Sequence, residues 1–286
     1  MRLGRWAAAA LFATGVVGGS LAPRVPIHEP ARAAATGSWR PTFTCTAFPA
    51  TARWRRGCCA TKPHGAGLDA FVLTNHNRVS TARAARRLAE GAPGPIVIVG
   101  QEMTARGFHV AAAGLEEPVD WTRGAVAAIR AVHAQGGVAI AAHPGRDYWQ
   151  GWDDASVALL DGYERAHPSM RAAINATDFG AFAARAARLR PAIAAIGSSD
   201  FHSGLAPGFC RTWVLARERS AAGVIEAVRD GRTVAMDMDG RFYGNAEAMR
   251  VVQEAGVAMP AAQRPTAWTR GAVAAAVLGL LLLMLL

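Results

Sequence analysis

The stretch AIAAIGSSDFH (192–202) runs from a short apolar segment directly into Asp200 and His202, which are metal-ligand residue types. Three more apolar segments end in the same way: LDAFVLT (68–74) leads to His76, PIVIVG (95–100) to Glu102, and GVAIAA (137–142) to His143. Buried strands that repeatedly present His, Glu and Asp at their carboxyl ends are typical of the mouth of a βα barrel that holds metal ions. The sequence therefore predicts a metal site at one end of an α/β barrel.

Amphipathic, Ala- and Arg-rich stretches of helical length lie between the apolar strands: residues 80–91, 120–135, 178–189 and 219–229. Asp120 is the expected N-cap of the second of these helices. Two further strands are expected at residues 212–216 and Thr233–Met236. Strands that alternate with helices of about 10–15 residues indicate parallel βαβ units, so the predicted fold class is α/β.

The charge and the cysteine content argue against two other classes of protein. The chain of 286 residues is long enough for one barrel-sized domain and carries a net charge of +10, with a single Lys among its 31 Lys and Arg residues. The Arg residues are scattered and do not form a basic run with aromatic neighbours, so no specific nucleic-acid partner is expected. The four Cys residues are too few and wrongly spaced for a disulfide framework or a zinc ribbon.

Both ends of the chain are apolar, which predicts contact with a membrane. Residues 1–36 begin with Arg2 and Arg5 and continue with an apolar stretch, so we expect a signal peptide or a membrane anchor. Residues 271–286 are uncharged and Leu-rich and form the predicted C-terminal hydrophobic helix, although they fall short of the ~20 residues that usually span a bilayer. A buried terminal helix is the alternative. Residues 245–270 are the expected linker, and the predicted location is membrane-associated and extracytoplasmic.

The residues at the strand ends suit metal binding for separate reasons. Glu102 follows a buried run, where an unpaired carboxylate is costly. His109 opens the apolar run HVAAAG, so it can face the same mouth as Glu102 across a short turn. Asp200 and His202 are two residues apart, and extended backbone places both side chains on one side. Each of these residues alone is more often structural, and it is their joint occurrence that favours an active site.

This ordered set resembles the PHP family of metal-dependent phosphoesterases, named for polymerase and histidinol phosphatase. The resemblance covers residues 67–244. The family's T-D-H-N motif resembles Thr74-Asn75-His76-Asn77, with Asn in place of the more common Asp. Its G-x-E motif resembles Gly100-Gln101-Glu102, and the His that follows resembles His109. Its H-P motif resembles His143-Pro144, and its D-x-H motif resembles Asp200 with His202. The resemblance implies a distorted (β/α)7 barrel.

The resemblance also implies a mechanism, the hydrolysis of a small-molecule phosphoester or ester by metal-activated water. Two or three divalent ions (Zn, Mn or Fe) would be held by His76, Glu102, His109, His143, Asp200 and His202. Glu102 would bridge two ions, and His202, or else His76, would protonate the leaving group. Arg211 is a candidate contact for the substrate's oxyanion, with an ordinary surface Arg as the alternative.

Two other functions stay open at this point. Residues 210–235 look most like a membrane-associated branch of the family that includes carbamate- and ester-cleaving hydrolases, so the same site could cleave a carboxylester or a carbamate. A degenerate, non-catalytic member that binds a metal or a ligand at the membrane belongs to a different class.

The family's first motif, D-L-H-x-H, is missing where it is expected. Residues 37–66 contain no His-x-His, and residues 41–66 hold three of the four Cys and the only Lys. Back-translation in a shifted reading frame permits Ala-Asp-Leu-His-Val-His from residue 41 onward, so we hypothesise that residues 41–66 are translated out of frame. In the chain as written, this aberrant segment is expected to supply no central strand and to leave the barrel open and the activity weak.

Overall fold

The computed structural model describes residues 7, 9–14, 43–48, 68–171, 173–201, 208, 210–255 and 267–285. The chain divides into two units, one of residues 1–28 and 259–286 and the other of residues 29–258. The larger unit holds the sheet and the predicted site residues. It has a mixed α/β fold, as the sequence predicts.

The described strands form one sheet in the order β10-β9-β8-β1-β2-β3-β4-β5-β6-β7. Their bounds are β1 Phe43–Phe48, β2 Ala70–Leu73, β3 Ile96–Thr104, β4 His109–Ala113, β5 Val138–Ala141, β6 Gly162–Ala166, β7 Ala194–Gly197, β8 Arg211–Val214, β9 Thr233–Met236 and β10 Phe242–Gly244. Neighbouring strands are parallel from β1 to β3 and from β5 to β7, while β4 runs antiparallel between β3 and β5. β8, β9 and β10 are antiparallel to their neighbours.

Opposite parts of the sheet approach each other, so that the sheet curls toward a barrel. Thr233 Oγ1 of β9 donates to Ala195 O of β7 at 2.9 Å. Thr212 Oγ1 of β8 accepts from Gly197 N at 2.9 Å and donates to Gly197 O at 3.0 Å. Side-chain hydrogen bonds therefore join β7 to β8 and β9. The structure thus shows a curled, mixed sheet, which is a coarser form of the predicted (β/α)7 barrel.

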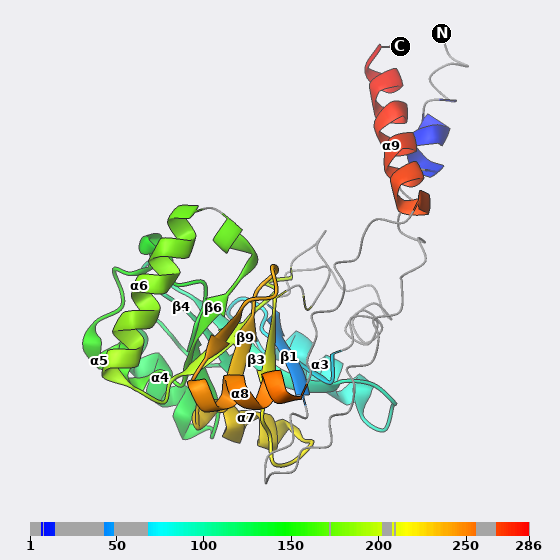
Figure 1. The fold of residues 1–286 in the computed structure, drawn as a ribbon. Helices are drawn as coiled ribbons and strands as arrows, with labels where there is room; N and C mark the ends of the chain where they lie inside the picture. The colour runs from blue at the N-terminus through cyan, green and yellow to red at the C-terminus, as the bar shows by residue number, and fades with distance from the viewer. Residues whose placement is uncertain are drawn as a thin grey trace. The chain divides into compact units, whose positions relative to one another are not determined.

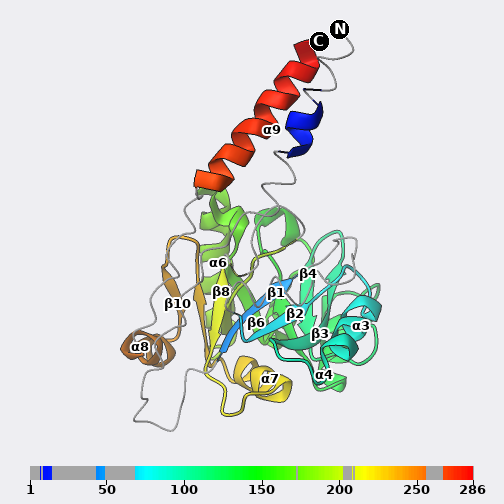
Figure 2. The same cartoon turned by 90° about the vertical axis from the view of Figure 1, so that its right-hand side faces the viewer.

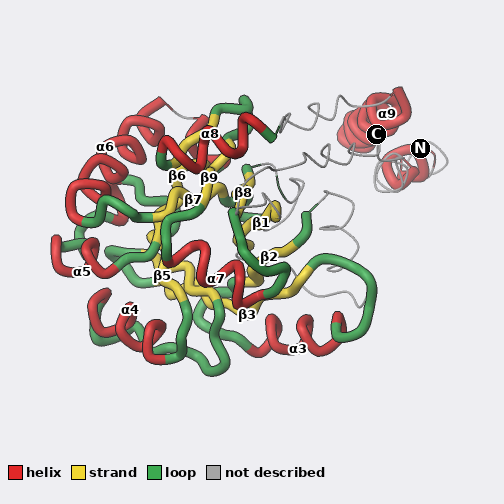
Figure 3. The backbone as a smooth tube through the Cα atoms, turned by 60° about the horizontal axis from the view of Figure 1, so that its bottom comes forward, coloured by secondary structure: helices red, strands yellow, loops and turns green. Residues whose placement is uncertain are grey.

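Helices cover the outside of the curled sheet (Figure 1). Apolar side chains from alternate strand positions fill its inside. The covering helices are α3 Ser80–Ala89, α4 Ala125–Ala134, α5 Asp154–Leu159 and α6 Ala173–Leu189, with short 3-10 turns η1 Arg146–Tyr148 and η2 Pro168–Arg171. α7 (Ala221–Arg229) contributes Val224, Ile225 and Val228 to the same buried cluster as the strands. It lies across the amino ends of the strands (Figures 2 and 3), so the opposite, carboxyl ends are left for a site.

Several helices begin at other residues than the sequence predicts, most clearly α4 and α6. α4 begins at Ala125 with Gly124 at its N-cap, so the prediction of Asp120 as the N-cap is wrong. Asp120 Oδ1 instead accepts hydrogen bonds from Thr122 N at 2.9 Å and Thr122 Oγ1 at 2.8 Å, and so closes a turn before the helix. α6 begins at Ala173, five residues before the predicted start at residue 178.

Part of the predicted linker, residues 245–270, is folded. α8 runs from Ala246 to Glu254 and buries Ala248 and Val252. Asn245 caps it, since its Oδ1 accepts a hydrogen bond from Ala248 N at 2.8 Å. The linker prediction is therefore wrong for these residues. The sequence did not reveal the helix because nine residues make too few turns to give a clear periodic signal.

β1 corrects the expectation for the aberrant segment, residues 37–66. It lies between β8 and β2, with Cys45 opposite both Ala70 and Thr212. The sequence FTCTAF is rich in aromatic and β-branched residues, which favour strands. The prediction of no central strand is therefore wrong for residues 43–48. Residues 49–66 lie outside the described residues, and the shifted-frame hypothesis stays a prediction.

The C-terminal hydrophobic helix is present as α9 (Ala267–Leu285), which begins four residues before the predicted start. Among the residues that the structure describes, no helix combines the length and apolar character needed to cross a membrane. Most of residues 1–36, the predicted signal peptide or anchor, lie outside the described part of the chain.

Gly100 of β3 tests this packing, because it lies in the crowded interior just below Glu102. A Cβ atom at Gly100 would lie 2.5 Å from Ala112 O and 2.7 Å from Val72 Cγ1. Gly180 in α6 is the matched control, since a Cβ atom there would meet nothing within 4 Å.

We predict that Gly100→Ala lowers the free energy of unfolding by roughly 1–3 kcal/mol, because the barrel interior must shift to admit the methyl group. Gly180→Ala should raise it by about 0.5–1 kcal/mol, since Ala favours a helix interior. Urea unfolding of both variants measures the difference. Equal stabilities would contradict the packing described for β3.

Candidate metal centre

The β3–β4 hairpin places Glu102 and His109 on the same inner face. Glu102 is in phase with Ile98, which points into the buried cluster, and only 2% of the Glu102 side chain is exposed. In the hairpin register Thr104 lies opposite His109 and Glu102 lies opposite Ala111. Side chains opposite each other or two residues apart share a face of the sheet, so Glu102 and His109 are diagonal neighbours.

His143 reaches the same point because the backbone breaks the strand alternation. Val138, Ile140 and Ala142 face the interior, so a regular strand would turn His143 outward. Instead His143 has a φ of +28°, in the left-handed region that side chains other than Gly rarely adopt. This conformation, two residues after the end of β5, lets the imidazole turn back toward Glu102.

The three side chains form a compact triad. Glu102 Oε1 lies 2.9 Å from His109 Nδ1 and 3.2 Å from His143 Nε2, and the two ring nitrogens are 3.2 Å apart. Tyr148 covers the two imidazoles, with ring centroids 4.5 Å and 4.9 Å away. Each member offers one ligand atom, and these atoms lie within 4.8 Å of one another, which is close enough to hold a metal ion.

The other oxygen of Glu102 also fits a cation. Glu102 Oε2 is buried and makes no hydrogen bond, although buried polar atoms in proteins nearly always have a partner. His76 Nδ1 is 3.6 Å from it, too far for a hydrogen bond, and lies 2.6 Å from Thr104 Oγ1. A divalent ion beside Glu102 would satisfy this oxygen. The donor set of one carboxylate with imidazole nitrogens suits Zn, Mn or Fe.

The pKa values of the triad also show that the Glu102 carboxylate needs a positive charge beside it. Burial alone would raise the pKa of Glu102, but the hydrogen bonds with His109 and His143 outweigh burial and lower it to about 2. Burial also opposes a charge on His143, yet its bond to Glu102 and the nearby Glu164 carboxylate raise the pKa of His143 to about 9. Without an ion, Glu102 is thus ionised and balanced by a proton on His143 at neutral pH. Because a metal ligand must give up its proton, an ion would take over this balancing role.

A second group of side chains adjoins the triad at the ends of β6 and β7. His167 Nε2 lies 3.3 Å from Asp200 Oδ2 and 3.9 Å from Glu164 Oε2. Burial raises the pKa of Glu164; it opposes the charge on Asp200 as well, but the bond with His167 lowers the pKa of Asp200. Glu164 Oε2 accepts from His143 N at 2.6 Å, which joins the two groups. His167 Nε2 thus lies between two carboxylates, a donor set that suits an ion.

Backbone strain is concentrated around these groups. Among the described residues, those other than Gly with positive φ are Asn77, His143 and Asp200, at +56°, +28° and +42°. Each follows a strand that leads to a predicted ligand. Such conformations typically cost about 1–3 kcal/mol each and are common at functional sites. The strain therefore supports a functional role for the strand ends.

The structure brings together only part of the predicted ligand set. Glu102, His109 and His143 form the triad, and His76 lies beside it. Asp200 belongs instead to the group with His167, and His202 lies outside the described residues.

Arg211, the predicted substrate contact, opens β8 at the same end of the sheet, where its backbone packs against Gly197. Burial lowers the pKa of Arg211 to about 10, and its Nε donates to Gly208 O at 3.0 Å. Its role toward a substrate stays a prediction.

Sequence reasoning missed Glu164, His167 and Tyr148. β6, with the sequence GYERA, lacks an apolar run, and so the strand that carries Glu164 was not recognised. The available signal was a second His-Pro pair, since His167-Pro168 repeats the pattern of His143-Pro144. Tyr148 lies in the short turn η1 and had no sequence signal of its own.

Comparison with known proteins supports the fold. No protein-family model matches the chain, and no curated protein matches it. Among solved structures, the chain is similar to a two-domain protein from Bacteroides vulgatus ATCC 8482 that contains a predicted PHP-like metal-dependent phosphoesterase. The TM-score is 0.59 at 22% sequence identity, over 82% of this chain and 74% of that one. This chain therefore shares the fold of a protein with a PHP-like domain, and its candidate metal triad lies at the carboxyl ends of the strands.

Proposed function

We propose that the chain is a metal-dependent hydrolase of phosphoesters. The observation that carries this proposal is the buried Glu102 carboxylate, which lies between His109 and His143 and keeps one oxygen without a hydrogen bond. The similarity in fold to a protein with a predicted metal-dependent phosphoesterase domain agrees with it. In this proposal Glu102, His109 and His143 hold one divalent ion, and Glu164, His167 and Asp200 help to hold a second.

The bound ions would supply a water of lowered pKa and would polarise the phosphoryl oxygen. The chain's own residues would do the rest. Glu102 would offer its carboxylate to the ion, and His143 would give up its proton and bind the ion through Nε2. Thr104 fixes the His76 ring through its hydrogen bond of 2.6 Å. His202 would protonate the leaving oxygen, and Arg211 would contact the substrate's oxyanion, as the resemblance implies. Water then adds to phosphorus, the ester P–O bond breaks, and the alcohol leaves with a proton.

We predict that the protein loaded with Zn, Mn or Fe hydrolyses 4-nitrophenyl phosphate or bis(4-nitrophenyl) phosphate. Glu102→Gln should lower kcat/KM by at least about 10- to 100-fold, the loss typical even for residues that only support a metal ligand. Glu116→Gln is the matched control and should keep full activity, because Glu116 pairs with Arg86 at an exposed site.

Three results would contradict this proposal. Full turnover by Glu102→Gln would show that Glu102 is not part of the active site. Hydrolysis of 4-nitrophenyl acetate without any phosphoester would instead favour the carboxylester or carbamate alternative. Absence of both turnover and bound ions, measured by elemental mass spectrometry, would favour a non-catalytic binding protein.

We also propose that α9 associates with a membrane surface and that the barrel domain is extracytoplasmic. Val277, Leu278, Leu280, Leu281 and Met284 are exposed by 47–77% and form one apolar stripe. An exposed stripe of this kind suits the boundary between lipid headgroups and acyl chains.

We predict that the full chain floats with phospholipid vesicles, because the α9 stripe is buried at their surface. A variant that ends before Ala267 should stay in the soluble fraction. Flotation of both proteins would show that α9 is not needed for the contact. For the location, protease added to intact cells should cleave the barrel domain, and protection of this domain would place it inside.

A further inference from the structure

The short turn η1 carries Tyr148 to the metal centre. η1 begins two residues after Pro144, in the loop that follows β5, so it lies at the same carboxyl end of the sheet as the triad. The centroid of the Tyr148 ring is 4.5 Å from that of His109 and 4.9 Å from that of His143, and the two imidazole centroids are 4.8 Å apart. The three rings thus pack as one group, and Tyr148 lies against both imidazoles that would hold an ion.

Hydrogen bonds on both sides of Tyr148 fix its position. Arg146 N donates to Asp178 Oδ2 at 3.0 Å, and Arg146 Nη2 donates to Asp178 Oδ1 at 3.2 Å. Asp178 belongs to α6 and is buried, so it ties the start of η1 to that helix. Just after η1, Trp149 Nε1 donates to Pro144 O at 3.0 Å. Tyr148 is therefore held in place before a substrate arrives, as a residue that contacts a substrate should be.

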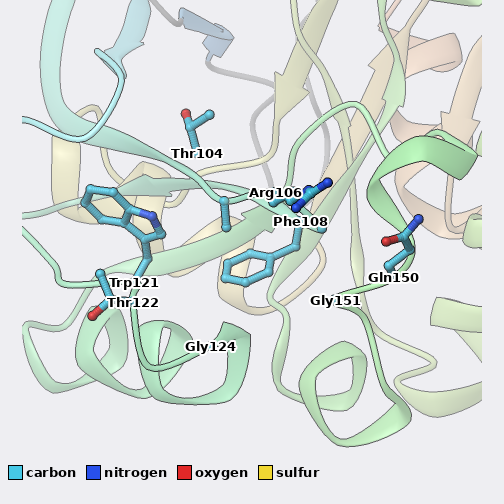
Figure 4. A pocket seen from close by; sticks show the side chains of 10 residues that line it. Thr104, Arg106, Phe108, Trp121, Thr122, Gly124, Gln150 and Gly151 are labelled. Atoms are coloured by element: carbon cyan, nitrogen blue, oxygen red, sulfur yellow. The ribbon is translucent and has the colours of Figure 1, made fainter.

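The segment after η1 is held to the β3–β4 hairpin as well. Gly151 N donates to Gly107 O at 2.9 Å, beside the pocket of Figure 4, which both glycines line. The two segments are so close that a Cβ atom at Gly107 would lie 2.9 Å from Gly151 N. His109 follows Gly107 by two residues. The hairpin that presents His109 thus also holds the segment that carries Tyr148.

The ring of Tyr148 makes these contacts, but its hydroxyl is left for another partner. Within the described part of the chain, the Tyr148 hydroxyl makes no hydrogen bond and is not buried, so it is open to solvent. The hydroxyl of Tyr243, in contrast, donates to Asp237 Oδ2 at 2.8 Å. A rigidly held donor without a partner, beside a metal centre, is suited to meet negative charge on a substrate.

We propose that Tyr148 is a catalytic residue whose hydroxyl donates a hydrogen bond to a non-bridging oxygen of the substrate's phosphoryl group. This proposal rests on the proposed hydrolase function. Tyr148 keeps its proton throughout. Its hydrogen bond strengthens as water adds to phosphorus and negative charge grows on the oxygen that accepts it. The role is separate from that of His202, which would serve the leaving oxygen.

The first test is the turnover of Tyr148→Phe, which removes the hydroxyl and keeps the ring on the two imidazoles. In the metal-loaded protein, kcat/KM for 4-nitrophenyl phosphate or bis(4-nitrophenyl) phosphate should fall about 10- to 100-fold, the loss expected when a hydrogen bond to a charged acceptor is removed. The bound metal, measured by elemental mass spectrometry, should stay the same. Tyr243→Phe is the matched control and should keep the wild-type kcat/KM, because its hydroxyl bonds to Asp237 at the end of β9.

Two outcomes of this test would overturn the role of Tyr148 and leave the hydrolase function standing. One is turnover by Tyr148→Phe at the wild-type rate. The other is a loss of turnover that is matched by a loss of bound metal, since the hydroxyl would then act on the metal site instead of on the substrate.

The second test needs no turnover. Isothermal titration calorimetry measures the Kd of inorganic phosphate on the metal-loaded full chain, and Tyr148→Phe should raise this Kd about 10-fold, while Tyr243→Phe should leave it unchanged. Phosphate binding that Tyr148→Phe weakens, in a protein that hydrolyses no phosphoester, would support the contact and overturn the hydrolase function. Equal phosphate affinity and equal turnover of wild type and Tyr148→Phe would overturn the contact itself.

Discussion

The buried carboxylate of Glu102 is the constraint on which the rest of the site depends. A carboxylate with 2% of its side chain exposed loses its hydration, and this loss must be offset by hydrogen bonds and positive charge. The β3–β4 hairpin supplies His109, and the left-handed backbone at His143 supplies the second imidazole. Because Gly100 has no side chain, Ala112 O and the Val72 side chain can pack closely against β3 below Glu102. Fold and site are thus coupled, because the same hairpin forms part of the sheet and orients the carboxylate.

The sequence predicted those parts of the fold that follow from strong local patterns. The apolar runs before His76, Glu102 and His143 are strands because such short runs are buried on both faces of the sheet. Their strand ends meet because parallel strands bring their carboxyl ends to one edge. The position of His143 could not be derived from strand alternation, since it depends on a φ of +28° that tertiary packing imposes.

The errors have equally physical causes. β6 was missed because Glu164 points inward from a strand without an apolar run, where the carboxylate faces His167 instead of making hydrophobic contacts. The N-cap of α4 was misplaced because Asp120 closes a local turn, which competes with capping for the same side chain. β1 was misjudged because its unusual composition was given more weight than the strand preference of Phe and Thr. His167 was passed over because its His-Pro pair follows no apolar run, yet its position beside Asp200 completes the second group.

The central claim is that Glu102, His109 and His143 together bind a divalent ion. The most direct measurement is a crystal structure of the protein grown with Mn²⁺, with anomalous differences recorded to locate the ion. The account predicts an anomalous peak at coordination distance, shorter than any hydrogen bond, from a Glu102 carboxylate oxygen and from the His109 and His143 ring nitrogens. A fully occupied Mn²⁺ peak elsewhere, with this triad still closed by its own hydrogen bonds, would contradict it.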